Sequence, residues 1–88
     1  MAKAYSKNKP FFTYRAIIEP DEGNTFHAYI PALPGCHTWG GSIPEARKHL
    51  REAALLYLVS LVEDKKRVPQ EEGFEFVETF SADEVKSA

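Results

Sequence analysis

The sequence predicts one small α+β domain with the element order β-β-β-α-β, in which a long helix lies across one face of a mainly antiparallel sheet. Three observations predict this fold. Apolar residues alternate with polar ones in residues 11–19, 25–30 and 74–80, which is the period of a half-buried strand. A helical repeat of three and four residues follows a capping motif at Ser42. Clusters of proline, glycine and aspartate separate these segments.

The first two strands are predicted to form a hairpin. Residues 11–19 (FFTYRAIIE) and residues 25–30 (TFHAYI) flank PDEGN, whose residues favour turns. One face of this hairpin is apolar and is expected to meet the helix. The other face is polar enough to meet water or a partner, and it carries Thr13, Arg15, His27 and Tyr29.

Residues 30–46 hold three of the six prolines and three of the five glycines, and each has a backbone role. Proline ends the second strand because it has no amide hydrogen, Pro34 and Gly35 reverse the chain before a short third strand, CHTWG, and paired glycines permit the bend into the helix. This segment is therefore interpreted as a joint that sets the sheet against the helix. The residues assigned to it are Pro31, Pro34, Gly35, Gly40, Gly41, Ser42 and Glu45.

The helix is predicted to run from its cap at Ser42 to about Asp64. Ser42 and Glu45 have the spacing of a capping box, and Pro44 falls in the first turn, where a missing amide hydrogen costs nothing. The second half of the helix is more apolar than one sheet face requires, so a second copy of the chain, in a homodimer or homotetramer, is expected to cover it. The residues assigned to this oligomer interface are Leu55, Leu58, Val59 and Val62.

Composition bounds the class of protein. The net charge of −2 argues against binding nucleic acid over the whole surface, and no apolar run approaches the roughly 20 residues of a membrane span. One cysteine suits a reducing compartment, so a cytoplasmic location is expected. Residues 1–10 are interpreted as a flexible lead, residues 11–80 as the domain and residues 81–88 as a frayed tail.

The residues that could suggest catalysis or metal binding have simpler structural explanations. Cys36 beside His37, with His27 one strand away, offers too few ligands for zinc, and neighbouring strand residues point to opposite faces, so an inert buried cysteine is favoured. Glu19, Asp21 and Glu22 resemble part of a nuclease carboxylate cluster, but they are better explained as acidic residues of a solvated turn. We therefore predict no enzyme activity, no metal and no cofactor.

With catalysis and metal binding disfavoured, protein binding is the function that the sequence favours. Trp39 belongs either to the core or to a surface shared with Tyr29 and His27, because exposed aromatic residues often carry the energy of protein interfaces. Residues 71–88 hold six acids against Lys86 as the only base, which suits a basic partner. The residues assigned to partner binding are His27, Tyr29, Trp39, Glu71, Glu72 and Glu75.

One segment of the chain resembles a known family. The hairpin YRAIIEPDEG, the segment YIPALPGCHTWGGSIPEA and the helix LREAALLYLVSLVED, followed by VP, resemble the HicB-like antitoxins over about residues 14–69. The resemblance implies a degenerate RNase H-like fold and an antitoxin that binds and inhibits a small mRNA-cleaving toxin of a type II toxin-antitoxin pair. The matching residues are Pro31, Leu33, Pro34, Gly35, Cys36, Gly40, Glu45 and Ala46.

The chain also departs from the pattern of that family. Ala32 and Gly41 stand where members usually carry acids, and residues 81–88 are too short for a C-terminal DNA-binding motif, so direct DNA binding is not expected. The alternative hypothesis is an orphan homo-oligomer that regulates or binds a ligand without a toxin partner. A nuclease that retains RNase H chemistry is the least favoured hypothesis.

Overall fold

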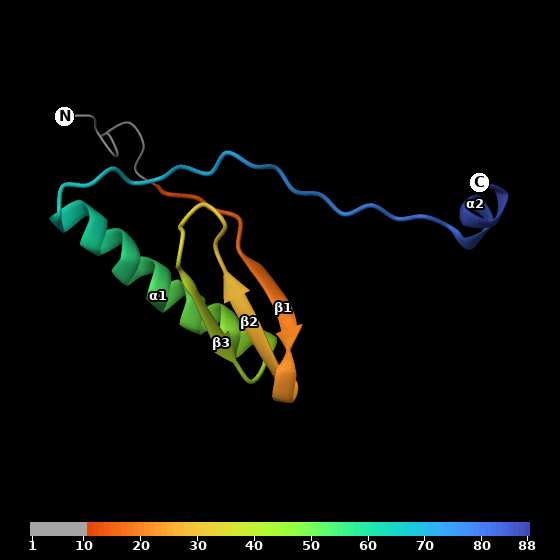
Figure 1. The fold of residues 1–88 in the computed structure, drawn as a ribbon, viewed down its shortest axis with the longest axis horizontal. Coiled ribbons are helices and arrows are strands. Elements are labelled where there is room, and N and C mark those ends of the chain that lie inside the picture. The colour runs from red at the N-terminus through yellow and green to blue at the C-terminus, as the bar shows by residue number, and fades with distance from the viewer. Residues whose placement is uncertain (1–10) are drawn as a thin grey trace.

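The computed structural model describes residues 11–88, and Figure 1 shows their arrangement: three strands form a sheet, and one long helix crosses behind it. The predicted flexible lead, residues 1–10, lies outside the described residues. The elements in order are β1 (Ile17–Asp21), the 3-10 turn η1 (Glu22–Asn24), β2 (Thr25–Tyr29), β3 (His37–Gly40), α1 (Ile43–Glu63) and α2 (Ala82–Ser87).

The hairpin forms as predicted, with β2 in the middle of an antiparallel sheet of order β1-β2-β3. Its turn uses two residues with positive φ, Gly23 at 69° and Asn24 at 58°, which are types that tolerate this backbone. The first strand begins at Ile17, later than the alternation of residues 11–19 predicts. The chain before it is engaged elsewhere, because the amide of Arg15 donates to a carboxylate of Glu71 rather than to a strand.

Two consecutive turns join β2 to β3. The amide of Leu33 donates to the carbonyl of Ile30 across Pro31, and the amide of Cys36 donates to the carbonyl of Leu33 across Pro34 and Gly35, each at 3.0 Å. The φ of Gly35 is +82°, and with proline before it this is the geometry of a type II turn. Backbone geometry therefore accounts for the Leu-Pro-Gly sequence here.

The geometry at the start of α1 explains why glycine and serine stand at residues 40–42. The hydroxyl of Ser42 accepts from the amide of Glu45 at 3.2 Å, whereas the Glu45 carboxylate accepts from the amide of Gly41, one residue earlier than a standard capping box predicts. A Cβ at Gly40 would overlap the backbone of Ala46. Gly40 is therefore needed less for a bend than for the close approach of β3 to the first turn of α1.

The core lies between α1 and the sheet. Ala46, Leu50 and Ala54 recur every four residues on the buried side of α1, and small side chains allow the helix to lie close to β3 and β2. The buried cluster is completed by Ala28, Ile30, Leu33 and Cys36. The α+β class, with an antiparallel sheet and one long helix, is confirmed.

The fourth strand predicted at residues 74–80 is absent from the described structure. Residues 66–81 follow α1 without regular secondary structure, run back past the start of β1 and extend away from the body (Figure 1). We call residues 67–73 the strap and residues 74–80 the arm. The radius of gyration is 17.1 Å, whereas a compact domain of this length has about 12 Å, in keeping with the arm and α2 extending away from the body (Figure 1).

The end of the chain also differs from the expected frayed tail. Residues 82–87 form α2, and Ser81 and Glu84 make a capping box in which each side chain accepts from the other residue's amide. All residues of α2 are exposed, so local capping rather than packing defines this short helix.

Candidate functional site

An aromatic cluster occupies the face of the sheet opposite α1. His27 lies directly across from Trp39, and Tyr29 lies across from His37, so the register places all four side chains on one face. The His27 ring stacks on Tyr29 at 5.2 Å between centroids and on Trp39 at 4.8 Å. Nε2 of His27 and Nδ1 of His37 share a hydrogen bond of 3.0 Å. We call these four residues the sheet-face cluster.

Contacts from neighbouring elements hold both the ring and the main chain of Trp39 in place while leaving 46% of the residue exposed. Its indole Nε1 donates to Oδ2 of Asp21 at 2.7 Å, and Nδ1 of His49 donates to its carbonyl oxygen, also at 2.7 Å. The bond from Trp39, the amide of Glu22 and the nearby His27 all favour the carboxylate form, so the pKa of Asp21 is lowered. The cluster is thus a preorganised aromatic surface with a carboxylate at its border.

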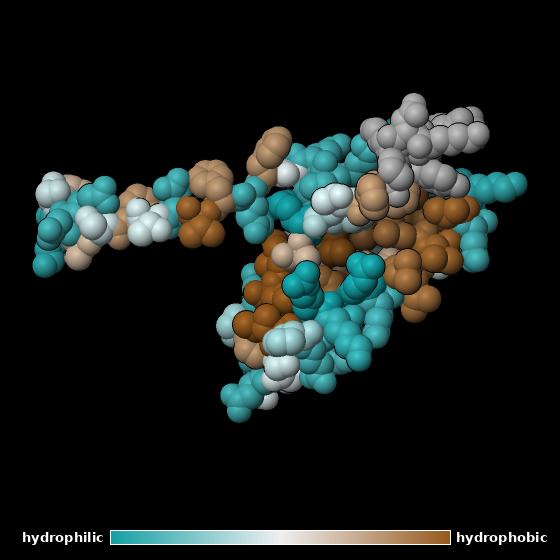
Figure 2. All heavy atoms as spheres, turned by 180° about the vertical axis from the view of Figure 1, so that it is seen from behind, coloured by the Kyte–Doolittle hydropathy of each residue, from teal (hydrophilic) through white to brown (hydrophobic). Residues whose placement is uncertain are grey.

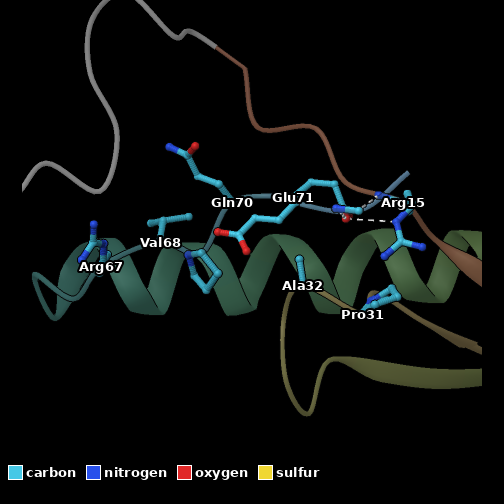
Figure 3. Close-up of a pocket in the computed structure, with 10 residues that line it drawn as sticks. Arg15, Pro31, Ala32, Arg67, Val68, Gln70 and Glu71 are labelled. Carbon is cyan, nitrogen blue, oxygen red and sulfur yellow. Dashed lines mark hydrogen bonds and ion pairs between the residues drawn. The ribbon is translucent and has the colours of Figure 1, made fainter. Parts of the chain in front are cut away.

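The strap forms a second polar centre, far from the cluster in sequence. Oε1 of Glu71 accepts from the amide of Arg15 at 3.0 Å, and Oε2 accepts from Nε of Arg15 at 3.0 Å and from the amide of Gly73 at 2.8 Å. Figure 3 shows the Arg15 and Glu71 side chains meeting in this way beside α1. These bonds, led by the two amides, lower the pKa of Glu71. The hydroxyl of Tyr14 donates to the carbonyl of Pro69, which fixes the other end of the strap.

A polar hollow of about 560 Å³ lies beneath the strap. Arg15 and Arg67 line it together with Glu71 and Glu72, and Ala32 forms part of its floor (Figure 3). The charges of Arg15 and Glu71 are largely satisfied by each other, while Glu75 lies 3.6 Å from Nη1 of Arg15 and stays 54% exposed. The outward acidic charge here is therefore that of Glu72 and Glu75 more than of Glu71.

The structure gives no support to a reactive cysteine. Burial raises the pKa of the Cys36 thiol, which disfavours the thiolate. Cys36, His27 and His37 border one shallow hollow of about 270 Å³, but no carboxylate lines it. Among residues 11–88, no three His, Cys, Asp or Glu side chains are placed together as metal ligands.

The residues assigned to oligomer contact divide between two environments. Leu55, Val59 and Val62 are exposed on α1, whereas Leu58 is half-buried and packs on the core. Leu56, which the sequence analysis did not single out, is 69% exposed. We call Leu55, Leu56, Val59 and Val62 the helix patch. Figure 2 shows apolar side chains gathered on the body and again along the arm.

The structure sorts the predicted binding residues into two groups. It brings His27, Tyr29 and Trp39 together and places Glu71, Glu72 and Glu75 on the strap and the start of the arm. Sequence reasoning missed His37 and Asp21 as members of the first site. Strand parity could have found both, since His37 is two residues from Trp39 and Asp21 is two residues from Glu19, which lies across from His27.

Comparison with known proteins identifies the family. Residues 14–84 match the family described as HicB_like antitoxin of bacterial toxin-antitoxin system. The chain belongs to the HicB-like antitoxin family. A crystal structure of the N-terminal domain of Burkholderia pseudomallei antitoxin HicB is similar at a TM-score of 0.54 and 28% identity, over 80% of this chain and 75% of that one.

Curated relatives of this HicB-like chain are proteins of the UPF0150 group. A UPF0150 protein of Synechocystis is 34% identical over 64 residues, which cover 73% of this chain and 81% of that protein. Another from Helicobacter pylori is 44% identical over 50 residues, covering 57% and 68%. The family and the solved relative suggest a non-catalytic protein with a toxin partner. Within residues 11–88, no helix has the length and apolar character to cross a membrane.

Proposed function

We propose that this HicB-like chain binds and inhibits a small, basic, mRNA-cleaving toxin in the cytoplasm and has no catalytic activity of its own. The observation that supports the proposal most strongly is the sheet-face cluster. Its four rings are packed on one another, and His37 and Trp39 are exposed on the open face of the sheet. Aromatic side chains fixed in this way bind a protein at little cost in conformational entropy.

Electrostatic attraction orients the toxin as it binds this surface. A toxin that holds RNA carries Lys and Arg on its working surface, and such a surface is attracted to carboxylates. Asp21 borders the cluster, and Glu72 and Glu75 project from the strap and the first part of the arm. Glu71 contributes by positioning, because its two oxygens hold Arg15 and Gly73. The proposed binding residues are therefore His27, Tyr29 and Trp39 with Glu71, Glu72 and Glu75.

The test uses the product of a short reading frame beside the gene, purified as a basic RNA-cleaving protein. Full-length chain is expected to bind it and to stop its cleavage of a labelled mRNA. Trp39→Ala should weaken binding by at least about 30-fold, the effect of a central interface residue. Leu56→Ala, an exposed apolar residue on α1, is the matched control and should change binding by less than about threefold.

One result would count against this function, and another would count only against the proposed binding surface. If the wild-type chain neither binds that protein nor reduces RNA cleavage, the orphan hypothesis, a homo-oligomer without a toxin, takes its place. If binding is strong but Trp39→Ala and Leu56→Ala behave alike, the chain is an antitoxin that uses a surface other than the sheet-face cluster.

A further inference from the structure

The indole ring of Trp39 is packed against two histidines and still keeps much of its surface open. The ring of His27 stacks on it at an interplanar angle of 29°, and the ring of His37 meets it at 55° with 5.0 Å between the centroids. Trp39 is nevertheless exposed. A ring held in this way presents a π face to a binding partner without losing much side-chain entropy on binding.

A carboxylate lies at the edge of that ring. Oδ2 of Asp21 accepts from the indole Nε1 of Trp39 at 2.7 Å, and Oδ1 accepts from the amide of Glu22 at 2.8 Å. The Asp21 side chain is exposed, and each of its oxygens has a further lone pair for another donor. The bond from the indole also shifts electron density into the ring, which makes its face more attractive to a cation. Trp39 and Asp21 therefore offer a π face and a carboxylate side by side.

The negative charge at this end of the sheet is not balanced by the described chain. Glu19 lies across from His27, which lies across from Trp39, so these residues form one row on the open face. Asp21 is two residues along β1 from Glu19 and shares that face. Within residues 11–88 both ion pairs join Arg15 to the segment after α1, so no Lys or Arg there neutralises Asp21 or Glu19. A positive group of another molecule would complete this surface.

An arginine side chain fits the surface better than other groups do. Its guanidinium is planar, so it can lie flat on an indole ring while its edge donates to a carboxylate beside the ring. A lysine ammonium is a compact and more strongly hydrated charge without that fork of donors. A nucleobase could stack on the same ring, but its phosphates would be repelled by Asp21 and Glu19.

We propose that Trp39 and Asp21 form a binding site for one arginine side chain of the basic toxin. The guanidinium stacks on the open side of the indole and donates to the Asp21 carboxylate, which stays bonded to the indole N–H. Glu19 adds a second negative charge on the same face. This inference rests on the proposed function, since it names the toxin group that meets the sheet-face cluster. It adds the requirement that binding depends on the charge of Asp21.

The first experiment uses the full-length chain and a blocked tripeptide with a central arginine, so it does not require the toxin. An NMR titration at low ionic strength, followed at the Trp39 indole N–H and the Asp21 amide, should show shifts that saturate. A peptide with citrulline in place of arginine keeps the shape of the side chain without its charge and should bind at least about fivefold more weakly. The lysine peptide should fall between the two.

Two charge variants and one ring variant locate the peptide. Asp21→Asn keeps an oxygen that can accept from Trp39 and removes the charge, so it should weaken the arginine peptide at least about fivefold. Glu22→Gln removes the same charge from the turn η1 and should change binding by less than about twofold. Trp39→Leu should abolish the preference for arginine over citrulline, measured at the Asp21 amide.

Three results of these titrations would overturn the inference. The first is equal affinity for the arginine and citrulline peptides. The second is an equal effect of the two charge variants. The third is a uridine oligonucleotide that shifts the Trp39 signal where the arginine peptide does not, which would make the cluster a site for bases.

The second experiment identifies the arginine in the toxin. Each toxin arginine is changed to glutamine and tested against wild-type chain and Asp21→Asn, and one of them should show non-additive losses with a coupling of at least about fivefold in the dissociation constant. A toxin that binds with no arginine coupled to Asp21 would overturn the inference and leave the antitoxin function standing. If the toxin does not bind, the proposed function fails; a positive peptide titration then still supports the arginine site, and a negative one removes both.

Discussion

The two segments TFHAYI, residues 25–30, and FEFVETF, residues 74–80, have the same alternating pattern and opposite fates. The first contains β2 (Thr25–Tyr29), which pairs on both sides and buries Ala28 against α1. The second is the arm, whose phenylalanines are exposed. Alternation therefore predicts an extended conformation with one apolar face, while a strand also requires an accessible edge. A two-turn connection supplies that edge to β2 and β3, whereas the strap directs the arm away from it.

The largest expected difference between the two regions is in stability. Leu33→Ala should lower the free energy of unfolding by about 2–5 kcal/mol, because Leu33 is the largest fully buried side chain. Phe76→Ala, in the diluted monomer, should change it by less than about 0.5 kcal/mol. Urea unfolding followed by Trp39 fluorescence measures both. Comparable losses would mean that the arm belongs to the core of its own chain.

The next largest difference is expected between the losses of stability caused by alanine at Gly40 and at Gly73. Gly40→Ala places a methyl group on the backbone of Ala46, which does not yield easily, so a loss of about 1–3 kcal/mol is expected. Gly73→Ala meets the end of the Arg15 side chain, which can move, so the loss should stay below about 0.5 kcal/mol. Thermal unfolding of both variants tests the pair. A larger effect at Gly73 would show that the strap is packed as tightly as the joint.

Removal of the N-cap serine of α1 and of the N-cap serine of α2 should change the free energy of unfolding by unequal amounts. Ser42 and Ser81 each accept from an amide three residues later. Ser42→Ala should cost about 1 kcal/mol of global stability, since α1 forms part of the core. Ser81→Ala should unwind α2 without altering the global transition. Circular dichroism and urea unfolding together distinguish the two, and a global loss from Ser81→Ala would mean that α2 is docked.

The smallest expected effect is a local response of the strap to pH. Because the pKa of Glu71 is lowered in the folded chain, its bonds to Arg15 and Gly73 are present at neutral pH and are lost only as the pH falls through that lowered pKa, below the ordinary range of a glutamate. The amides of both residues should then exchange faster, with little change in β2. In Glu71→Gln this acid-dependent step should disappear. An unchanged step in that variant would assign it to another carboxylate.

The body was predictable because its signals are local. Ser42 with Glu45, Pro34 with Gly35, and the spacing of Ala46, Leu50 and Ala54 each determine structure within a few residues. The sheet-face cluster was predictable in part, since His27, Tyr29 and Trp39 lie on one face, but the hydrogen bonds of His37 and Asp21 depend on strand register. The strap could not be predicted, because Arg15 and Glu71 are 56 residues apart and no periodic pattern links them.

The prediction of a fourth strand at residues 74–80 was wrong for a related reason. Periodicity reports on the face of a segment and says nothing about whether the chain leading to it can reach a free edge. Here Glu71 is held by Arg15 and Gly73, and the arm starts from that point in another direction. The account of the whole molecule therefore depends on one claim: within a single chain the sheet is complete with three strands.

Hydrogen exchange on the full-length protein, diluted until it is monomeric, tests that claim most directly. The amides of Thr25–Tyr29 should exchange slowly, and those of residues 74–80 should exchange at nearly the rate of an unstructured peptide. Slow exchange in both segments of the monomer would show that the arm forms the fourth strand on its own chain, and it would contradict the account.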